Sequence, residues 1–198
     1  ELQTGGTRGI FGSGTTPGAN NFIGFINVDS TGDEQDFGDL SAQDQGASGG
    51  ASSRVRGLFA GGQNPTGNQI QFLTIASQGV DAQDFGDLSR NTRFTEGAAD
   101  ATRAVFHGGI DPSSNRENTI EFVTIASTGD AIDFGDTTIA RGQARGCGSQ
   151  TRGIYSCGQG PNSAATGSGS TRVNVQDFIT FSTTGNATDF GDSTIESD

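Results

Sequence analysis

Paired aspartates recur four times in this chain and are its clearest candidates for chemistry. Each pair encloses a Phe-Gly step in an Asp-Phe-Gly-Asp motif. The four motifs are Asp36, Phe37, Gly38 and Asp39; Asp84, Phe85, Gly86 and Asp87; Asp133, Phe134, Gly135 and Asp136; and Asp189, Phe190, Gly191 and Asp192. Carboxylates around a glycine turn can bind a hard cation such as Ca²⁺, and two carboxylates across a cleft can serve a hydrolase.

A structural role for these aspartates competes with calcium binding. Residues 81–84 and 130–133 would add oxygen ligands to the second and third motifs. However, Glu34 and Asn186 alter the first and fourth copies, and no copy has the spacing of a known calcium loop. In the structural interpretation, each Asp caps backbone N–H groups in a turn and the Gly adopts a positive φ. We predict this role, with no metal and no other cofactor.

One arginine also recurs in each repeat, at the start of a short apolar segment. The four are Arg8, Arg56, Arg103 and Arg152. A binding function rarely needs four equivalent arginines, whereas a repeated structural contact does. Because the planar guanidinium can hold a carboxylate with two hydrogen bonds, we expect each Arg to pair with an Asp of its own or the adjacent repeat.

The remaining candidates for catalysis stand alone. His107 is the only histidine, and small residues occupy its place in the other repeats. A single His without partners builds neither a zinc site nor a Ser-His-Asp triad, so we expect a tolerated polar residue at the end of a strand. Tyr155, the only tyrosine, fills a core Phe position. Cys147 and Cys157 are interpreted as small buried residues on neighbouring strands, with a disulfide as the alternative. These features predict a protein that is not an enzyme.

The motifs belong to a repeat of roughly fifty residues. The Asp-Phe-Gly-Asp motif recurs in steps of 48, 49 and 56 residues, and the Arg motif in steps of 48, 47 and 49. A third motif, rich in Ile, Phe, Val and Thr, lies between them at 22–26, 70–75, 120–125 and 176–181 and predicts a strand. The sequence is thus one domain, 1–198, with repeats at about 7–54, 55–101, 102–150 and 151–198.

Strands rather than helices must position these motifs, because no segment has a sustained helical period. The third motif is apolar on both faces, which predicts packing on both sides of each sheet. We therefore predict an all-β fold, a β-propeller of four kelch-like blades. The two chain ends supply nearly one complete inter-motif segment, so we expect the ring to close between them and remove exposed sheet edges. The alternative is four blades of a longer array.

Two resemblances follow from particular motifs. The apolar strand ending in Gly61-Gly62 or Gly108-Gly109, followed by residues 118–122, resembles a kelch-type blade. The kelch Trp is missing, and the motif Phe stands near its place, so we expect Phe37, Phe85, Phe134 and Phe190 to do the packing of that Trp. The pattern across 118–129, 133–136 and 151–155 is similar to repeats in predicted virion structural and tail-fibre proteins of marine tailed phages. That resemblance implies a component of a virus particle and no chemistry.

A long loop in the fourth repeat is the largest departure from the repeat. It runs over 159–172 and is mostly Gly, Ser, Thr, Asn and Ala. Loops on a rigid scaffold often carry function, so we expect polar contacts from Gln159, Asn162, Thr166 and Arg172 to a neighbouring subunit. A passive insertion is the alternative.

The net charge of −12 disfavours nucleic acid, and the sequence has no apolar run of membrane-spanning length, so no membrane partner is expected. We predict a non-enzymatic virion structural protein, located in the virion or extracellularly. It would be a phage tail-fibre, appendage or capsid-decoration propeller that acts in assembly or host-surface attachment. Other virion proteins, identical subunits and a host-surface glycan are the expected partners. The alternatives are a secreted or surface lectin-like propeller and, more remotely, a hydrolase with paired Asp.

Overall fold

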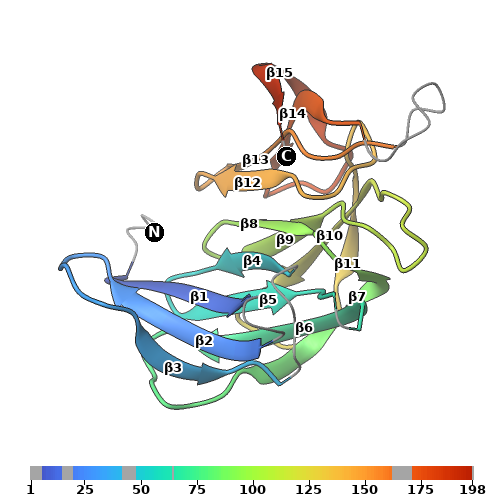
Figure 1. Cartoon of the computed structure of the whole chain (residues 1–198). Coiled ribbons are helices and arrows are strands. Elements are labelled where there is room, and N and C mark those ends of the chain that lie inside the picture. Colours follow the sequence, from blue (N-terminus) through green and yellow to red (C-terminus); the bar gives the residue numbers. More distant parts are fainter. Residues whose placement is uncertain (1–5, 15–19, 42–47, 64, 162–170, 198) are drawn as a thin grey trace.

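The computed structural model describes residues 6–14, 20–41, 48–63, 65–161 and 171–197, and its regular elements in these residues are all β-strands. The strands form four antiparallel sheets that follow one another in chain order (Figure 1). The prediction of an all-β fold is confirmed, and the arrangement is consistent with a propeller-like fold. Among the described residues, no helix is long and apolar enough to cross a membrane.

We number the sheets I to IV along the chain. Sheet I contains β1 (Arg8–Gly14), β2 (Asn20–Asn27) and β3 (Gln35–Asp39). Sheet II contains β4 (Gly49–Ser52), β5 (Arg56–Ala60), β6 (Gly67–Thr74) and β7 (Gln83–Thr92). Sheet III contains β8 (Glu96–Ala99), β9 (Arg103–His107), β10 (Thr119–Thr124) and β11 (Ile132–Asp136). Sheet IV contains β12 (Arg145–Gly148), β13 (Arg152–Ser156), β14 (Val173–Thr180) and β15 (Thr188–Ser197).

Each sheet is a meander in which the sequence motifs hold fixed places. The Arg motif forms β1, β5, β9 or β13, the third motif forms the next strand, and Asp-Phe-Gly-Asp lies in the last. The register is the same in all four sheets: the motif arginines face Asn27, Thr74, Thr124 and Thr180. The repeats are therefore structural copies, except that no strand precedes the Arg motif of sheet I among the described residues, whereas one does in the other sheets.

The motif Asp-Phe-Gly-Asp does not form a chain reversal, although the expected capping bond is present in the fourth copy, where Gly191 donates its N–H to Asp189 Oδ1 at 3.0 Å. The motif lies within β3, β7, β11 and β15. A shift in strand register, typical of a β-bulge, interrupts the pairing of this strand beside each motif. The expected positive φ of the glycine is present, at 149°, 146°, 146° and 137° along the chain. The bulge, rather than a chain reversal, is the reason that glycine is favoured here.

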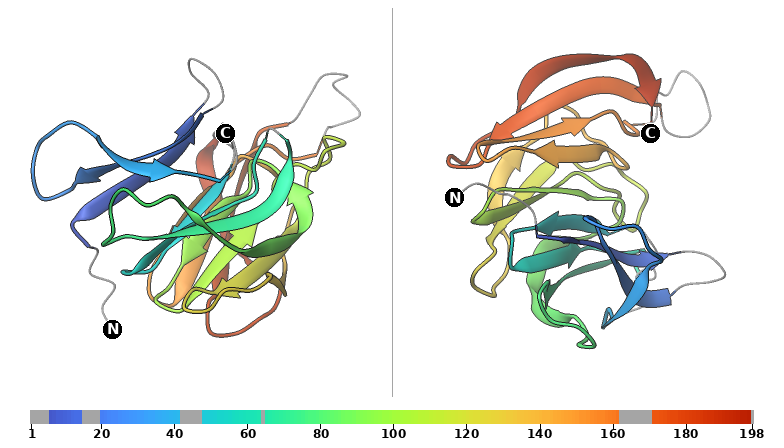
Figure 2. Two further views of the ribbon diagram at one scale, coloured as in Figure 1. Left: turned by 90° about the horizontal axis from the view of Figure 1, so that it is seen from below. Right: turned by 90° about the vertical axis from the view of Figure 1, so that its left-hand side faces the viewer.

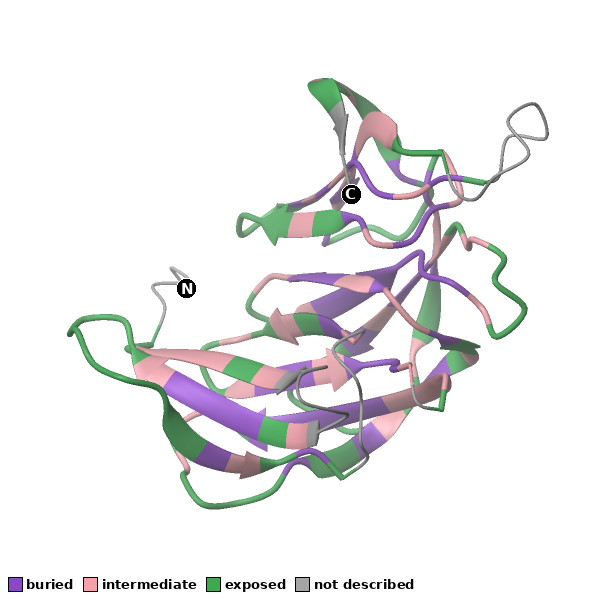
Figure 3. Ribbon diagram, in the orientation of Figure 1, coloured by how far each residue is buried: buried purple, intermediate pink, exposed green. Residues whose placement is uncertain are grey.

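The hydrophobic cores lie between successive sheets, so each sheet is buried on both faces where it has two neighbours (Figure 3). We call the face of a sheet that meets the next sheet its leading face, and the face that meets the preceding sheet its trailing face. At the first contact, Ile23, Phe25 and Phe37 on the leading face of sheet I pack with Leu73 and Ala82 of sheet II. Equivalent positions build the other two cores, which explains the apolar residues on both faces of the third motif.

The expected closure of a ring by the two chain ends is not seen among the described strands. β15 pairs with β14 as far as Ser197, and β1 has β2 as its only partner strand. Sheets I and IV lie at opposite ends of the row of sheets (Figures 1 and 2). The C-terminal strand β15 pairs within its own sheet, and among the described residues it makes no pairing with sheet I.

Candidate functional site

The Asp-Phe-Gly-Asp motif is a connector between sheets. Three equivalent bonds run from a glycine N–H to the motif Phe carbonyl of the preceding sheet: Gly79 to Phe37, Gly129 to Phe85 and Gly185 to Phe134, at 2.8, 2.7 and 2.7 Å. A second set joins an alanine N–H to the carbonyl of the last motif Asp: Ala82 to Asp39, Ala131 to Asp87 and Ala187 to Asp136, each at 2.8 Å. The backbone of the motif therefore bonds the segment that leads into the last strand of the next sheet.

The side-chain oxygens that the competing calcium interpretation would use take part in the same contact. Asp39 donates its N–H to Asp81 Oδ1 at 3.1 Å, and Asp87 donates to Asp130 Oδ1 at 3.0 Å. Asp136 makes the equivalent bond to Asn186 Oδ1, which shows that an amide oxygen serves as well as a carboxylate. Within the described part of the chain, no three His, Cys, Asp or Glu side chains are grouped as metal ligands would be.

The motif glycine is required by the close approach of the next sheet. A Cβ on Gly86 would lie 2.4 Å from the carbonyl oxygen of Gly129, and one on Gly135 would lie 2.5 Å from that of Gly185. Real Cβ contacts are never so short, so only glycine allows the two backbones to meet. At Gly191, in the fourth copy, a Cβ would meet no described atom within 4 Å.

The repeated arginine is a second connector, but its expected carboxylate partner is wrong. In the first three copies the guanidinium donates from Nη1 to a backbone carbonyl of the next sheet: Arg8 to Ile75, Arg56 to Ile125 and Arg103 to Phe181, at 2.7, 2.8 and 2.5 Å. Each of the four arginines also lies over an aromatic ring of its own sheet, at 4.6–4.8 Å from the ring centroid. The ring fixes the side chain, and the carbonyl aligns the neighbouring sheet.

The motif phenylalanines pack as expected in three copies and differ in the fourth. All four make edge-to-face contacts with a Phe of the adjacent strand, at 5.7–6.1 Å between ring centroids. Phe37, Phe85 and Phe134 are buried against the next sheet, whereas Phe190 is 51% exposed. Its exposure contradicts the expectation that every copy replaces the kelch Trp in a core.

A buried polar position, not recognised from the sequence, links the same sheets. Gln71, Glu121 and Asp177 are equivalent residues that accept N–H bonds from Ser41, Ser89 and Thr138 of the preceding sheet. Arg90 forms an ion pair with Glu121, and Arg141 forms one with Asp177 at 2.7 Å. Arg141 and Asp177 are fully buried. The only signal in the sequence was a polar residue at a fixed place in an otherwise apolar strand.

His107 is the last residue of β9, so its predicted place at a strand end is confirmed, but it is buried in the contact between sheets III and IV. It is 1% exposed, and its ring centroid is 3.6 Å from that of Tyr155. Burial and the nearby Arg141 and Arg90 guanidinium groups hold the pKa of His107 well below its usual range. Burial raises the pKa of Tyr155. Both groups stay neutral near pH 7, and their burial prevents contact with a substrate in this conformation.

The cysteines and the fourth-repeat loop take different places. Cys147 is exposed on β12, contrary to the expectation of burial, and it is not joined to the buried Cys157 by a disulfide. Gln159 forms isolated backbone bridges with Gly142 and Arg172, which fix the base of the loop. Asn162 and Thr166 lie outside the described residues.

A cavity of about 420 Å³ lies beside β1, between sheet I and the first strands of sheets II, III and IV. Arg8 and Ile10 of β1 line one wall, and the small residues of β4 and β8 line the other. Cys147 and Gly148 of β12 close one end. The cavity is thus bounded by the strands nearest the middle of the molecule rather than by the Asp-Phe-Gly-Asp motifs.

Comparison with known proteins does not assign the chain to a family. No family model matches the chain, and no curated protein matches it in sequence. The kelch and tailed-phage resemblances therefore stay predictions from the motifs.

Proposed function

We propose that this protein is a non-enzymatic structural module whose sheets form a rigid scaffold for assembly. One observation carries the proposal: the groups that recur in every repeat are used to join one sheet to the next. The Phe and Asp carbonyls, the Asp N–H and the Arg guanidinium make the same bonds at three successive contacts. Residues repeated for catalysis or ligand binding would have no need of this shared geometry.

We place the module on a virus particle, as a tail-fibre, appendage or capsid-decoration protein that acts in assembly or host-surface attachment. Support comes from the resemblance of the repeats to phage structural proteins and from the acidic composition, which suits a particle surface. Other virion proteins or identical subunits would be its partners. A virion or extracellular location follows from the same proposal.

Purified virus particles test this placement. Mass spectrometry of particles purified through a density gradient, combined with immunogold labelling, measures copy number and position. We expect a fixed number of copies of the protein per particle, and gold label at one part of the particle, such as a fibre. Absence from particles whose other structural proteins are detected would contradict it.

The cavity beside β1 favours a second candidate function, a lectin-like glycan-binding module. Arg8 and Arg54 supply hydrogen-bond donors to it, and Phe59 supplies an apolar surface, a combination that suits a sugar ring. A glycan array tests this candidate. Binding that Arg54→Ala abolishes would support it, while an array without signal, or a signal unchanged by Arg54→Ala, would exclude the cavity as the site.

A further inference from the structure

Each contact between two sheets of the chain joins the leading face of one sheet to the trailing face of the next. The two sheets at the ends of the row each have one such face without a neighbour among the described residues. Sheet IV presents an unused leading face, and sheet I an unused trailing face. We propose that sheet IV of one copy docks onto sheet I of a second copy, head to tail, through the contact already made three times within the chain. This deepens the proposed assembly function by naming one partner, a second copy of the chain.

The leading face of sheet IV has both connectors of the interior contacts, the repeated Arg and the Asp-Phe-Gly-Asp motif. Arg152 is held over the Phe178 ring at 4.6 Å, in the position of the three bonded arginines, and is exposed. Phe190 has the same edge-to-face contact as its buried equivalents but is 51% exposed. Gly191 keeps the positive φ, with open space around it. Among the described residues, these groups meet no following sheet.

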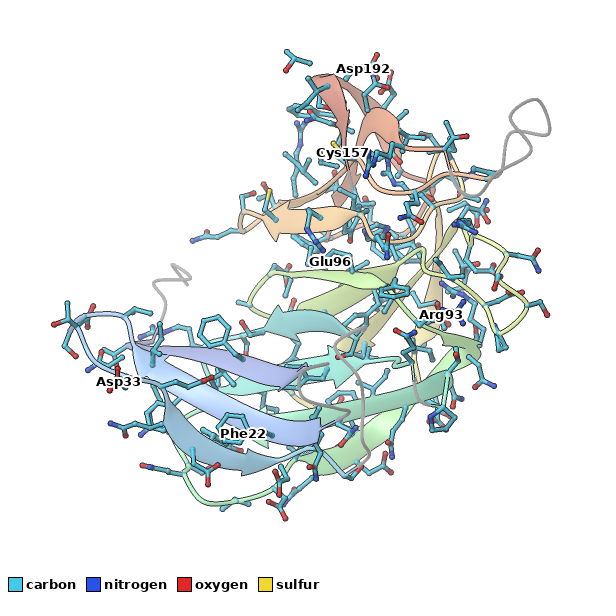
Figure 4. All side chains as sticks on the ribbon, in the orientation of Figure 1. Phe22, Asp33, Arg93, Glu96, Cys157 and Asp192 are labelled. Atoms are coloured by element: carbon cyan, nitrogen blue, oxygen red, sulfur yellow. The ribbon has the colours of Figure 1, made fainter. Side chains whose placement is uncertain are left out.

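The trailing face of sheet I has the matching acceptors and apolar residues. Phe11 is 55% exposed, although its equivalents Phe106 and Tyr155 are buried against the preceding sheet. Val28 is 59% exposed and occupies the place of Ile75, Ile125 and Phe181, whose carbonyls accept the arginines. Gly32 and Asp33 stand five and four residues before the motif Phe, as Gly129 and Asp130 do. Figure 4 shows Asp33 and Asp192 at opposite ends of the molecule.

Glu34 adapts the trailing face of sheet I to the same contact. Sheet I has Gly24 where the other sheets have Gln71, Glu121 and Asp177. The Glu34 side chain covers Gly24 so closely that a Cβ there would lie 2.1 Å from Glu34 Oε1. The carboxylate of Glu34, the residue that precedes β3, thus takes the place of the missing acceptor. Its partner would be the N–H of Thr194, which is equivalent to Ser41, Ser89 and Thr138.

The partner is a second copy, because sheets I and IV of one chain cannot meet without changing the three contacts between its successive sheets. Three contacts with the same bonds set a similar step from each sheet to the next. Four sheets at this step leave sheets I and IV at opposite ends (Figure 2). Closure within one chain would distort three satisfied contacts, whereas a second copy can dock with none changed. Such a head-to-tail contact forms a ring if the rotation closes, and a filament if it does not.

Two variants and a matched control test the proposal in the full chain. Sedimentation and mass photometry measure self-association over a concentration series. Val28→Asp disrupts the trailing face of sheet I, and Phe190→Asp disrupts the leading face of sheet IV. Ile132→Asp adds the same charge at a residue of β11 that is 62% exposed and belongs to neither end face. Circular dichroism and thermal melting establish that each variant folds.

The wild-type chain should form species of at least twice its 20.2 kDa mass. Each end-face variant should weaken this association about 30-fold or more, as loss of a central interface residue does, and Ile132→Asp should not. Because the contact joins different faces, an equal mixture of the two end-face variants should form a mixed dimer through the one intact contact. A wild-type chain that is monomeric at every concentration, or folded end-face variants that associate normally, would overturn the proposal. A mixture that stays monomeric would overturn the head-to-tail geometry. These outcomes do not depend on whether the protein is found in virus particles.

Discussion

The contact between sheets III and IV and the open face of sheet IV use the same motif in different surroundings. Phe134 and Phe190 have the same neighbour within their own sheets, a Phe at 5.9 or 6.1 Å, yet only Phe134 is buried. Arg103 reaches a carbonyl of the next sheet, whereas Arg152 makes only its own-sheet ring contact among the described residues. The motif is therefore half of a contact, and its energetic value depends on whether a second sheet is present.

The largest difference is expected between Phe134→Ala and Phe190→Ala. Phe134→Ala should lower the free energy of unfolding by about 3–5 kcal/mol, because it opens a cavity in a core between two sheets. Phe190→Ala should cost about 1 kcal/mol, because half of that side chain is already exposed. Urea denaturation of dilute protein measures both values. Equal losses would show that Phe190 is buried in solution.

A smaller difference is expected between the arginines. Arg103→Ala removes a hydrogen bond to the Phe181 carbonyl and a ring contact, and should cost about 1.5–3 kcal/mol. Arg152→Ala removes the ring contact alone, which contributes about 0.5–1 kcal/mol at an exposed site. The same denaturation experiment compares them, with Arg152→Lys as a charge-retaining control. A larger effect at Arg152 would contradict the assigned roles.

His107 should make stability fall with pH below its ordinary pKa of about 6.5. Burial lowers the pKa of His107 in the folded protein, so the unfolded chain binds a proton that the folded chain excludes. Below about pH 6.5 the free energy of unfolding should therefore decrease by about 1.4 kcal/mol per pH unit, until the folded pKa is reached. No contribution is expected above that pH. His107→Ser, which introduces the residue found at 156, should remove this part of the pH dependence; an unchanged slope would place its origin in another group.

The smallest effect is expected from calcium. The motif aspartates and their neighbours make hydrogen bonds between sheets, so added Ca²⁺ or a chelator should leave the melting temperature unchanged. Asp133→Asn should cost less than Phe134→Ala, with or without the ion. A melting temperature that rises with Ca²⁺ and falls with chelator would instead indicate a bound cation, because a ligand that binds the folded state stabilises it.

The strands could be predicted from the sequence because the apolar periodicity, the residue composition and the fifty-residue repeat indicate the same segments. The apolar residues on both faces of the third motif, Ile120 and Val123 among them, correctly indicated sheets packed on both sides. The partners of the motif arginines were missed because a backbone carbonyl leaves no mark in a sequence. The burial of His107 was missed because it depends on a neighbouring sheet, in which Tyr155 replaces Phe. Closure of the ring stays a prediction, because segment lengths do not give the rotation between sheets and no described strand joins sheet I to sheet IV.

Amide hydrogen exchange tests most directly whether the motif joins one sheet to the next. The N–H groups of Gly79, Gly129 and Gly185 donate to motif Phe carbonyls, whereas Gly32, their equivalent in sheet I, has no preceding sheet within the described chain. Exchange followed by NMR in dilute protein should show slow exchange at the first three glycines and fast exchange at Gly32, with Gly32 becoming protected as concentration rises. Protection of Gly32 in the dilute monomer, or fast exchange at the three interior glycines, would contradict the account.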